Sequence, residues 1–165
     1  MGSCSEYKPE PMVSTVANRP PEGERKVDAL RPRVAIICCS GTIDRLYPAA
    51  VLAAEAVDRG LAVSVLLTFW AVMAVRRTPG PFAQLVSRDC GVQGSALAEL
   101  IRQSPGTSWI ALLGAAKQRG DLHVSACAFT LNLFDITAEE LDPVVESVVG
   151  MGSFLADADG SVLVF

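Results

Sequence analysis

Residues 33–68 read "RVAIICCSGTIDRLYPAAVLAAEAVDRGLAVSVLLT", and this stretch decides the fold. Its first part, residues 33–39, is a continuous apolar run that ends in a Ser-Gly turn, which is typical of a strand buried on both faces. Residues 47–60 have alanine-rich helical spacing with Pro48 near the helix start. Residues 61–68 return to the pattern of a buried strand. A strand, a helix and a strand in this order predict a right-handed crossover and a parallel sheet.

The alternation of strands and helices continues through the rest of the chain. Helices are predicted over residues 69–77, 95–103, 107–120 and 152–159, and strands over residues 122–127, 144–149 and 161–165. Residues 78–94 break all periodicity with Gly and Pro and predict a loop. Thr137 followed by Glu140 has the pattern of a capping box. Together these elements predict an α/β domain, a three-layer sandwich with a mostly parallel sheet of about five strands.

The length and composition predict one folded domain over residues 33–165, because 165 residues, half of them apolar, suffice for a real core. Residues 1–32 hold five of the ten prolines and no apolar periodicity, and they predict a disordered tail. This tail lacks the apolar centre of a secretory signal, so we expect the cytoplasm. The apolar run at residues 60–75 is shorter than the roughly 20 residues that cross a bilayer, so no stable membrane insertion is expected.

Charge and cysteine usage argue against a nucleic-acid partner, a disulfide framework and a bound metal. The net charge is -4 and the basic residues are scattered, which argues against a nucleic-acid partner. Five cysteines, an odd number without a C-x-x-C pair, do not predict a disulfide framework. The single histidine, His123, has no second pair of ligands at zinc-finger spacing, and no nucleotide-binding motif is complete. We therefore expect neither a metal nor another cofactor.

The candidate site lies beyond the carboxyl ends of the strands, where parallel sheets bind their ligands. The segments that follow the first three predicted strands meet there. They contribute Cys39, Ser40 and Gly41 after the first strand, Thr68, Phe69 and Trp70 after the second, and Cys127 after the third. Because side chains alternate along a strand, His123, Ser125 and Cys127 share one face, whereas Leu122, Val124 and Ala126 share the other.

The role of each cysteine is open from the residues alone. A helix beginning after Cys127 would stabilise its thiolate through free N–H groups and the helix dipole. Free cysteines are also among the most commonly buried residues, so Cys127 fits a core position equally well. Cys38 is expected to fill the core, and Cys39 lies nearer the mouth of the crevice. Cys90, in the predicted loop, is either an incidental surface thiol or a second sulfur-handling or resolving cysteine.

Three segments resemble the DsrE/DsrF family of small sulfur-handling proteins, in its single-chain, DsrE-like branch. They are the Ser-Gly-Thr-Ile-Asp turn with Tyr47-Pro48, the Leu-Leu-Thr-Phe-Trp strand exit, and the Ala-Cys segment that runs to Phe-Asp-Ile. The resemblance covers residues 33–77 and 121–165, and it adds Thr42 and Tyr47 to the crevice. The chain departs from the family at Ser40, where relatives often carry a basic residue, and in residues 78–94.

The resemblance implies a five-stranded α/β domain that assembles into homo- or hetero-oligomers. It also implies that Cys127 matches the cysteine that carries a persulfide and exchanges it with TusA-like carriers or rhodanese-like partners. A persulfide relay needs one nucleophilic sulfur and the sulfur of a partner, which suits a lone thiol.

Three functions are therefore compared. The first is a sulfur carrier or sulfurtransferase, with Cys127 as the persulfide site and Cys90 as an auxiliary thiol. The second is a thiol redox protein of the peroxiredoxin-like kind, in which Cys90 or Cys39 resolves a sulfenic acid. The third is a non-catalytic oligomeric module whose crevice binds a ligand or partner and whose thiols are inert. The residues and the resemblance together favour the first.

Overall fold

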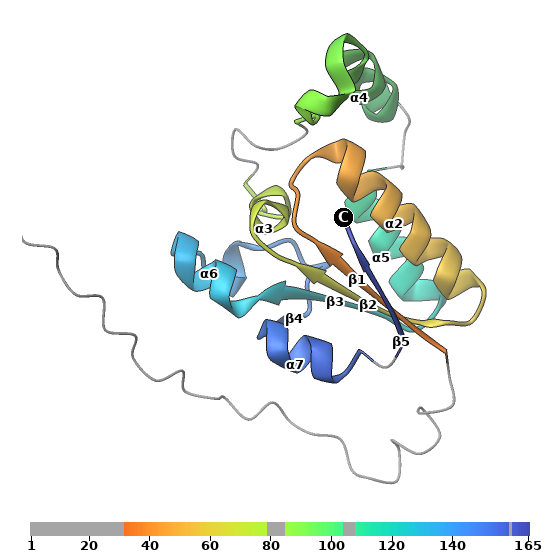
Figure 1. The fold of residues 1–165 in the computed structure, drawn as a ribbon, viewed down its shortest axis with the longest axis vertical. Coiled ribbons are helices and arrows are strands. Elements are labelled where there is room, and N and C mark those ends of the chain that lie inside the picture. The colour runs from red at the N-terminus through yellow and green to blue at the C-terminus, as the bar shows by residue number, and fades with distance from the viewer. Residues whose placement is uncertain (1–31, 79–84, 104–107, 159) are drawn as a thin grey trace, which may run out of the picture. The chain divides into compact units, whose positions relative to one another are not determined.

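The sheet consists of five strands that are all parallel (Figure 1). The computed structural model describes residues 32–78, 85–103, 108–158 and 160–165, so the predicted tail lies outside the described residues apart from Pro32. The strands are β1 (Arg33–Cys38), β2 (Ala62–Leu67), β3 (Leu122–Cys127), β4 (Ser147–Val149) and β5 (Gly160–Val164). Their order in the sheet is β4-β3-β2-β1-β5. The predicted α/β class and the predicted number of strands are confirmed.

Helices connect the strands and cover the sheet. The α-helices are α2 (Ile43–Asp58), α3 (Trp70–Ala74), α4 (Gly94–Gln103), α5 (Trp109–Arg119), α6 (Ala128–Phe134) and α7 (Met151–Ala156). Two short 3-10 helices are η1 (Arg88–Gln93) and η2 (Ala138–Glu140), and the predicted capping box of Thr137 and Glu140 opens η2. In the described part of the chain, no helix combines the length and the apolar character that a membrane span requires.

Two sequence-based boundaries were wrong. The first helix begins at Ile43 rather than Tyr47, and Pro48 lies inside it. The earlier start is stabilised from outside the helix, because the N–H of Ile43 donates to the carbonyl of Leu85 at 2.8 Å. The predicted loop is also partly helical, since residues 88–93 form η1 and α4 starts at Gly94, while residues 79–84 of that loop lie outside the described residues.

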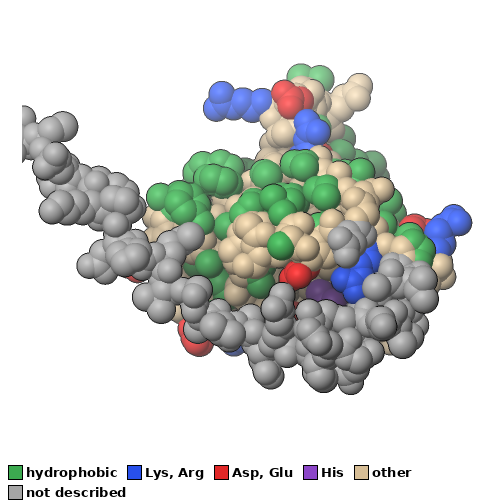
Figure 2. Space-filling model, turned by 60° about the horizontal axis from the view of Figure 1, so that its bottom comes forward, with side chains coloured by type: hydrophobic (Ala, Val, Ile, Leu, Met, Phe, Trp, Pro, Cys, Tyr) green, Lys and Arg blue, Asp and Glu red, His purple; other side chains and the backbone are tan. Residues whose placement is uncertain are grey.

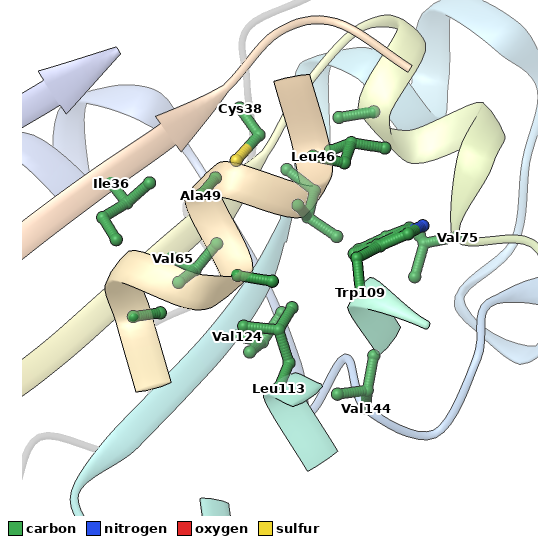
Figure 3. Close-up of a cluster of buried hydrophobic side chains, with 14 of the residues drawn as sticks. Ile36, Cys38, Leu46, Ala49, Val65, Val75, Trp109, Leu113, Val124 and Val144 are labelled. Carbon is green, nitrogen blue, oxygen red and sulfur yellow. The ribbon is translucent and has the colours of Figure 1, made fainter. Parts of the chain in front are cut away.

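The main core lies between the sheet and the pair formed by α2 and α5. It includes Ile36, Val65 and Val124 from the strands and Trp109 and Leu113 from α5 (Figure 3). The face bearing Cys127 instead packs against α7 in a smaller cluster of Ala35, Ile37, Leu66, Cys127 and Phe154. The predicted alternation in β3 is therefore confirmed, because Leu122, Val124 and Ala126 belong to the main core and Cys127 to the smaller cluster.

Gly41 lies where the segment that follows β1 packs closely against the segment that follows β2. A Cβ added at this buried glycine would meet the carbonyl oxygen of Trp70 well inside van der Waals contact, whereas one added at Gly114 in α5 would meet nothing within 4 Å. We predict that Gly41→Ala lowers the free energy of unfolding by about 1–3 kcal/mol. Gly114→Ala is the matched control and should raise it by about 0.5–1 kcal/mol, because alanine favours a helix interior. Urea unfolding measures both, and equal effects of the two substitutions would contradict the prediction.

Candidate functional site

Cys127 lies where β3 ends and α6 begins. It is the last residue of the strand and the N-cap residue of the helix, and it is only 2% exposed. Its side chain closes no capping hydrogen bond. The helix predicted to follow Cys127 is therefore confirmed, and the thiol is buried where backbone N–H groups of α6 face it.

Two buried threonines lie beside this thiol. Thr68 follows β2 and Thr130 lies in the first turn of α6, and their hydroxyl oxygens are 2.9 Å apart. The Thr130 oxygen also accepts a hydrogen bond from the N–H of Phe69 at 3.0 Å. Two hydroxyls carry two hydrogens, and the bond between them uses one, so a second hydrogen is available to the sulfur of Cys127.

The pKa of Cys127 is lowered despite its burial. Burial alone raises the pKa of this thiol, but the N–H of Thr130, the hydroxyls of Thr68 and Thr130 and the N–H of Phe129 together outweigh burial. Phe129 and Thr130 are the second and third residues of α6, whose N–H groups normally face the side chain at the N-cap. These donors favour the thiolate, which is the nucleophilic form of cysteine.

Phe69 adopts a strained backbone conformation next to the threonine pair. Its φ of 48° and ψ of -120° are rarely adopted by residues other than glycine. The hydrogen bond from its N–H to Thr130 holds this conformation. The ring of Phe69 makes an edge-to-face contact with the ring of Phe129, with centroids 6.4 Å apart. Both rings remain accessible, at 42% and 59% exposure.

An apolar and uncharged rim surrounds the buried thiol. Trp70 is 50% exposed and contacts Phe134 with ring centroids 5.7 Å apart, and Leu133 is also exposed. The seven residues of α6 carry no charge. Figure 2 shows hydrophobic side chains gathered over much of the face that it turns forward. Clustered exposed aromatic side chains are typical of a surface that a partner covers.

Four of the predicted crevice residues line one hollow. Ser40, Gly41, Thr42 and Trp70 enclose about 190 Å³ together with Leu85, which sequence analysis did not single out. The hydroxyls of Ser40 and Thr42 are joined at 2.9 Å. Tyr47, also predicted for the crevice, lies in the second turn of α2 and packs against the main core.

The other described cysteines differ in their surroundings. Cys38 is buried in the main core, and burial, with a smaller effect of the neighbouring Cys39, raises its pKa to about 12. Cys39 is half-buried against the smaller cluster, and burial raises the pKa of its thiol. Cys90 is half-buried in η1, where its sulfur lies 3.6 Å from the hydroxyl of Ser87, which in turn binds Asp44 in α2. Cys90 therefore lies beside the start of α2, away from the threonine pair.

His123 lies near the amino end of β3, at the opposite end of the strand from Cys127. It is exposed, and its two ring nitrogens lie 2.5 Å from a carboxylate oxygen of Glu146 and 3.1 Å from one of Asp121. Within the described ranges of the chain, no three His, Cys, Asp or Glu side chains gather in a way that would hold a metal ion.

Sequence reasoning missed Thr130 and Phe129. The sequence contained the information needed to predict them, because the side chain of an N-cap residue faces the N–H groups two and three positions later. Cys127 as N-cap thus implies that Phe129 and Thr130 supply its donors. The contribution of Thr68 depends on the pairing of β2 with β3, which sequence periodicity alone does not define.

Comparisons with known proteins bear on the family. No protein-family model matches the chain. The sulfur carrier protein DsrE2 of Allochromatium vinosum is 27% identical over 135 residues, which cover 69% of this chain and 85% of that protein. The crystal structure of the ychN protein from E. coli matches with a TM-score of 0.51 and 18% identity, over 82% of this chain and 100% of that chain. A protein of unknown function from Methanobacterium thermoautotrophicum, MTH1491, matches with a TM-score of 0.45 and 15% identity, over 81% of this chain and 99% of that chain.

The resemblance to DsrE-like proteins is confirmed by these findings. The likeness to the ychN protein concerns the fold, whereas the relative with a similar sequence is a sulfur carrier.

The donors around Cys127 generate a prediction about its reactivity. We predict that Thr130→Val slows alkylation of Cys127 by iodoacetamide at neutral pH by about three- to tenfold, because a hydroxyl donor beside the thiolate is lost. Thr130→Ser keeps the hydroxyl and should restore the rate. The control is Ser125→Ala. It removes a hydroxyl that lies on the same face of β3 as Cys127 and binds Ser147 of β4. A rate in Thr130→Val equal to that of the unmodified chain would contradict this assignment.

The strain at Phe69 is tested with a matched pair of variants. Both Phe69→Gly and Phe69→Ala remove the ring, but only glycine tolerates the observed backbone angles. We predict that the glycine variant is more stable than the alanine variant by about 1 kcal/mol, since about 1–3 kcal/mol of strain exceeds the entropy that glycine loses on folding. Urea unfolding gives the difference, and a more stable alanine variant would show that the backbone is not strained.

Proposed function

We propose that this DsrE-like chain is a cytoplasmic sulfur carrier or sulfurtransferase that holds sulfane sulfur as a persulfide on Cys127. The observation that carries the proposal is the group of hydrogen-bond donors around this buried thiol, which lowers its pKa. The sulfur carrier of similar sequence supports the same chemistry.

The proposed reaction has two exchange steps. The thiolate of Cys127 attacks the outer sulfur of a donor persulfide, so that a new S–S bond forms at Cys127 and the donor leaves as a thiolate. In the second step the thiolate of an acceptor attacks that outer sulfur, and the bond to Cys127 breaks. A low pKa favours both steps, because it populates the attacking thiolate and makes Cys127 a good leaving group. Neither step needs an oxidant or a cofactor.

The proposed partners are proteins that carry sulfur on a cysteine, of the TusA-like or rhodanese-like kind. Phe69, Trp70 and Phe129 form an exposed, uncharged rim that a partner with an apolar contact surface would cover. The chain is further proposed to form a homo-oligomer, as the family resemblance implies. Cys90 is kept as an auxiliary thiol in this proposal.

The peroxiredoxin-like alternative has less support. It needs a resolving cysteine within disulfide distance of Cys127. Because β2 lies between β1 and β3, the Cα atoms of Cys39 and Cys127 are two strand spacings, or about 10 Å, apart. A disulfide needs a Cα–Cα distance of less than about 7 Å. Cys90 binds Ser87 near the start of α2.

The proposal is tested by loading the purified chain with inorganic polysulfide and measuring its mass. We expect an added sulfur atom of about 32 Da on Cys127, removed by dithiothreitol and absent from Cys127→Ser. Cys90→Ser and Cys38→Ala are the controls and should retain this adduct on Cys127. An unchanged adduct in Cys127→Ser would refute the proposed site.

A further inference from the structure

Cys39 and Cys127 lie in the same row at the carboxyl edge of the sheet, where a row is a set of residues that pair with one another across neighbouring strands. Cys38 pairs with Leu67, and Leu67 pairs with Ala126. The next row therefore brings together Cys39, Thr68 and Cys127, and the hydrogen bond from the N–H of Thr68 to the carbonyl of Cys38 at 2.9 Å extends the pairing to it. In parallel strands, residues of one row point to the same face of the sheet.

Packing agrees with this alignment of the two thiols. Cys127 belongs to the small cluster under α7, and Cys39 packs against that same cluster. Cys38 points the opposite way, into the main core. The two thiols thus share one face, with the side chain of Thr68 between them. Cys39 is half-buried, whereas Cys127 is only 2% exposed, so Cys39 is the more accessible sulfur of the pair.

The spacing of the row excludes a disulfide but suits the passage of a sulfur atom. Two strand spacings place the Cα atoms about 10 Å apart, beyond the roughly 7 Å limit of a disulfide. A persulfide on Cys127 carries its outer sulfur about 2 Å further. Rotation of both side chains about χ1 toward Thr68 brings that sulfur and the Cys39 thiol closer together.

We propose that Cys39 is an internal sulfur acceptor, which takes the outer sulfur from Cys127 and presents it to the partner protein. This inference rests on the proposed function, because it starts from the persulfide of Cys127. It gives the chain two sulfur-binding positions, a buried one that receives sulfur and a more exposed one that delivers it.

The transfer balances without any further reagent. The sulfur of Cys39 attacks the outer sulfur of the Cys127 persulfide, the new bond forms at Cys39, and the bond between Cys127 and the outer sulfur breaks. Cys39 gives up its proton to water, and Cys127 leaves as the thiolate. The direction is favourable, since the hydrogen-bond donors that lower the pKa of Cys127 make it the better leaving group, while burial raises the pKa of Cys39.

Peptide mapping of the full chain tests the relay directly. Trypsin releases Cys127 in residues 120–165, Cys39 together with Cys38 in residues 34–45, and Cys90 in residues 89–102. The chain is loaded with limiting inorganic polysulfide, trapped with iodoacetamide at successive times and digested. We expect sulfur on residues 120–165 first and on Cys39 afterwards.

Two variants test the dependence of one thiol on the other. Loading of Cys39 should fall at least tenfold in Cys127→Ser, and Cys39→Ser should keep its sulfur on residues 120–165. Cys38→Ala, which leaves Cys39 as the sole thiol in its peptide, is the control and should behave as the unmodified chain.

The outcomes separate the relay from the proposed function. Sulfur that loads residues 120–165 but never reaches residues 34–45 overturns the relay and leaves Cys127 as the persulfide site. Equal loading of Cys39 in Cys127→Ser and in the unmodified chain also overturns it, because Cys39 then accepts sulfur directly. Absence of sulfur from residues 120–165 in every variant refutes the proposed function itself. The order of loading in the unmodified chain provides the test even if Cys127→Ser fails to fold.

Discussion

The parallel register of β1, β2 and β3 is the constraint on which the site depends. These strands end at the same edge of the sheet, so the residues that follow them meet there although they are far apart in sequence. Thr68 reaches Thr130 across 62 positions of the chain because β2 pairs with β3. A shift of one residue in that pairing would turn the side chain of Thr68 to the opposite face and leave Cys127 without this donor.

Burial and hydrogen bonding act in opposite directions on Cys127, and their balance decides its chemistry. In the same sheet, Cys38 is just as buried but faces an apolar core, and its pKa rises to about 12. Cys127 has comparable burial but faces N–H and hydroxyl groups, and its pKa falls. The two thiols therefore differ in the direction of their pKa because donors face Cys127, and these donors come from the first turn of α6 and from Thr68. The strained backbone of Phe69 belongs to this arrangement, since its N–H binds the hydroxyl of Thr130.

The sheet and the position of Cys127 could be predicted from local patterns. The apolar run at residues 33–39 and the alternation at residues 122–127 define strands, and their ends lie at the ligand-binding edge of any parallel sheet. The start of α2 could not be predicted, because a carbonyl of Leu85, distant in sequence, binds its first N–H. For the same reason Leu85 was missing from the predicted crevice. Contacts between segments far apart in sequence depend on register and packing, which periodicity does not reveal.

Covering one face of the sheet with large helices and the other with a short one has a chemical consequence. The face under α2 and α5 holds the main core. Among the described residues, the opposite face packs against the six-residue helix α7 through a cluster of five buried residues. Both Cys127 and the more accessible Cys39 lie on this thinly covered side. Adjacent cysteines at the end of β1 thus have different environments, because alternation sends Cys38 into the main core and Cys39 toward the smaller cluster.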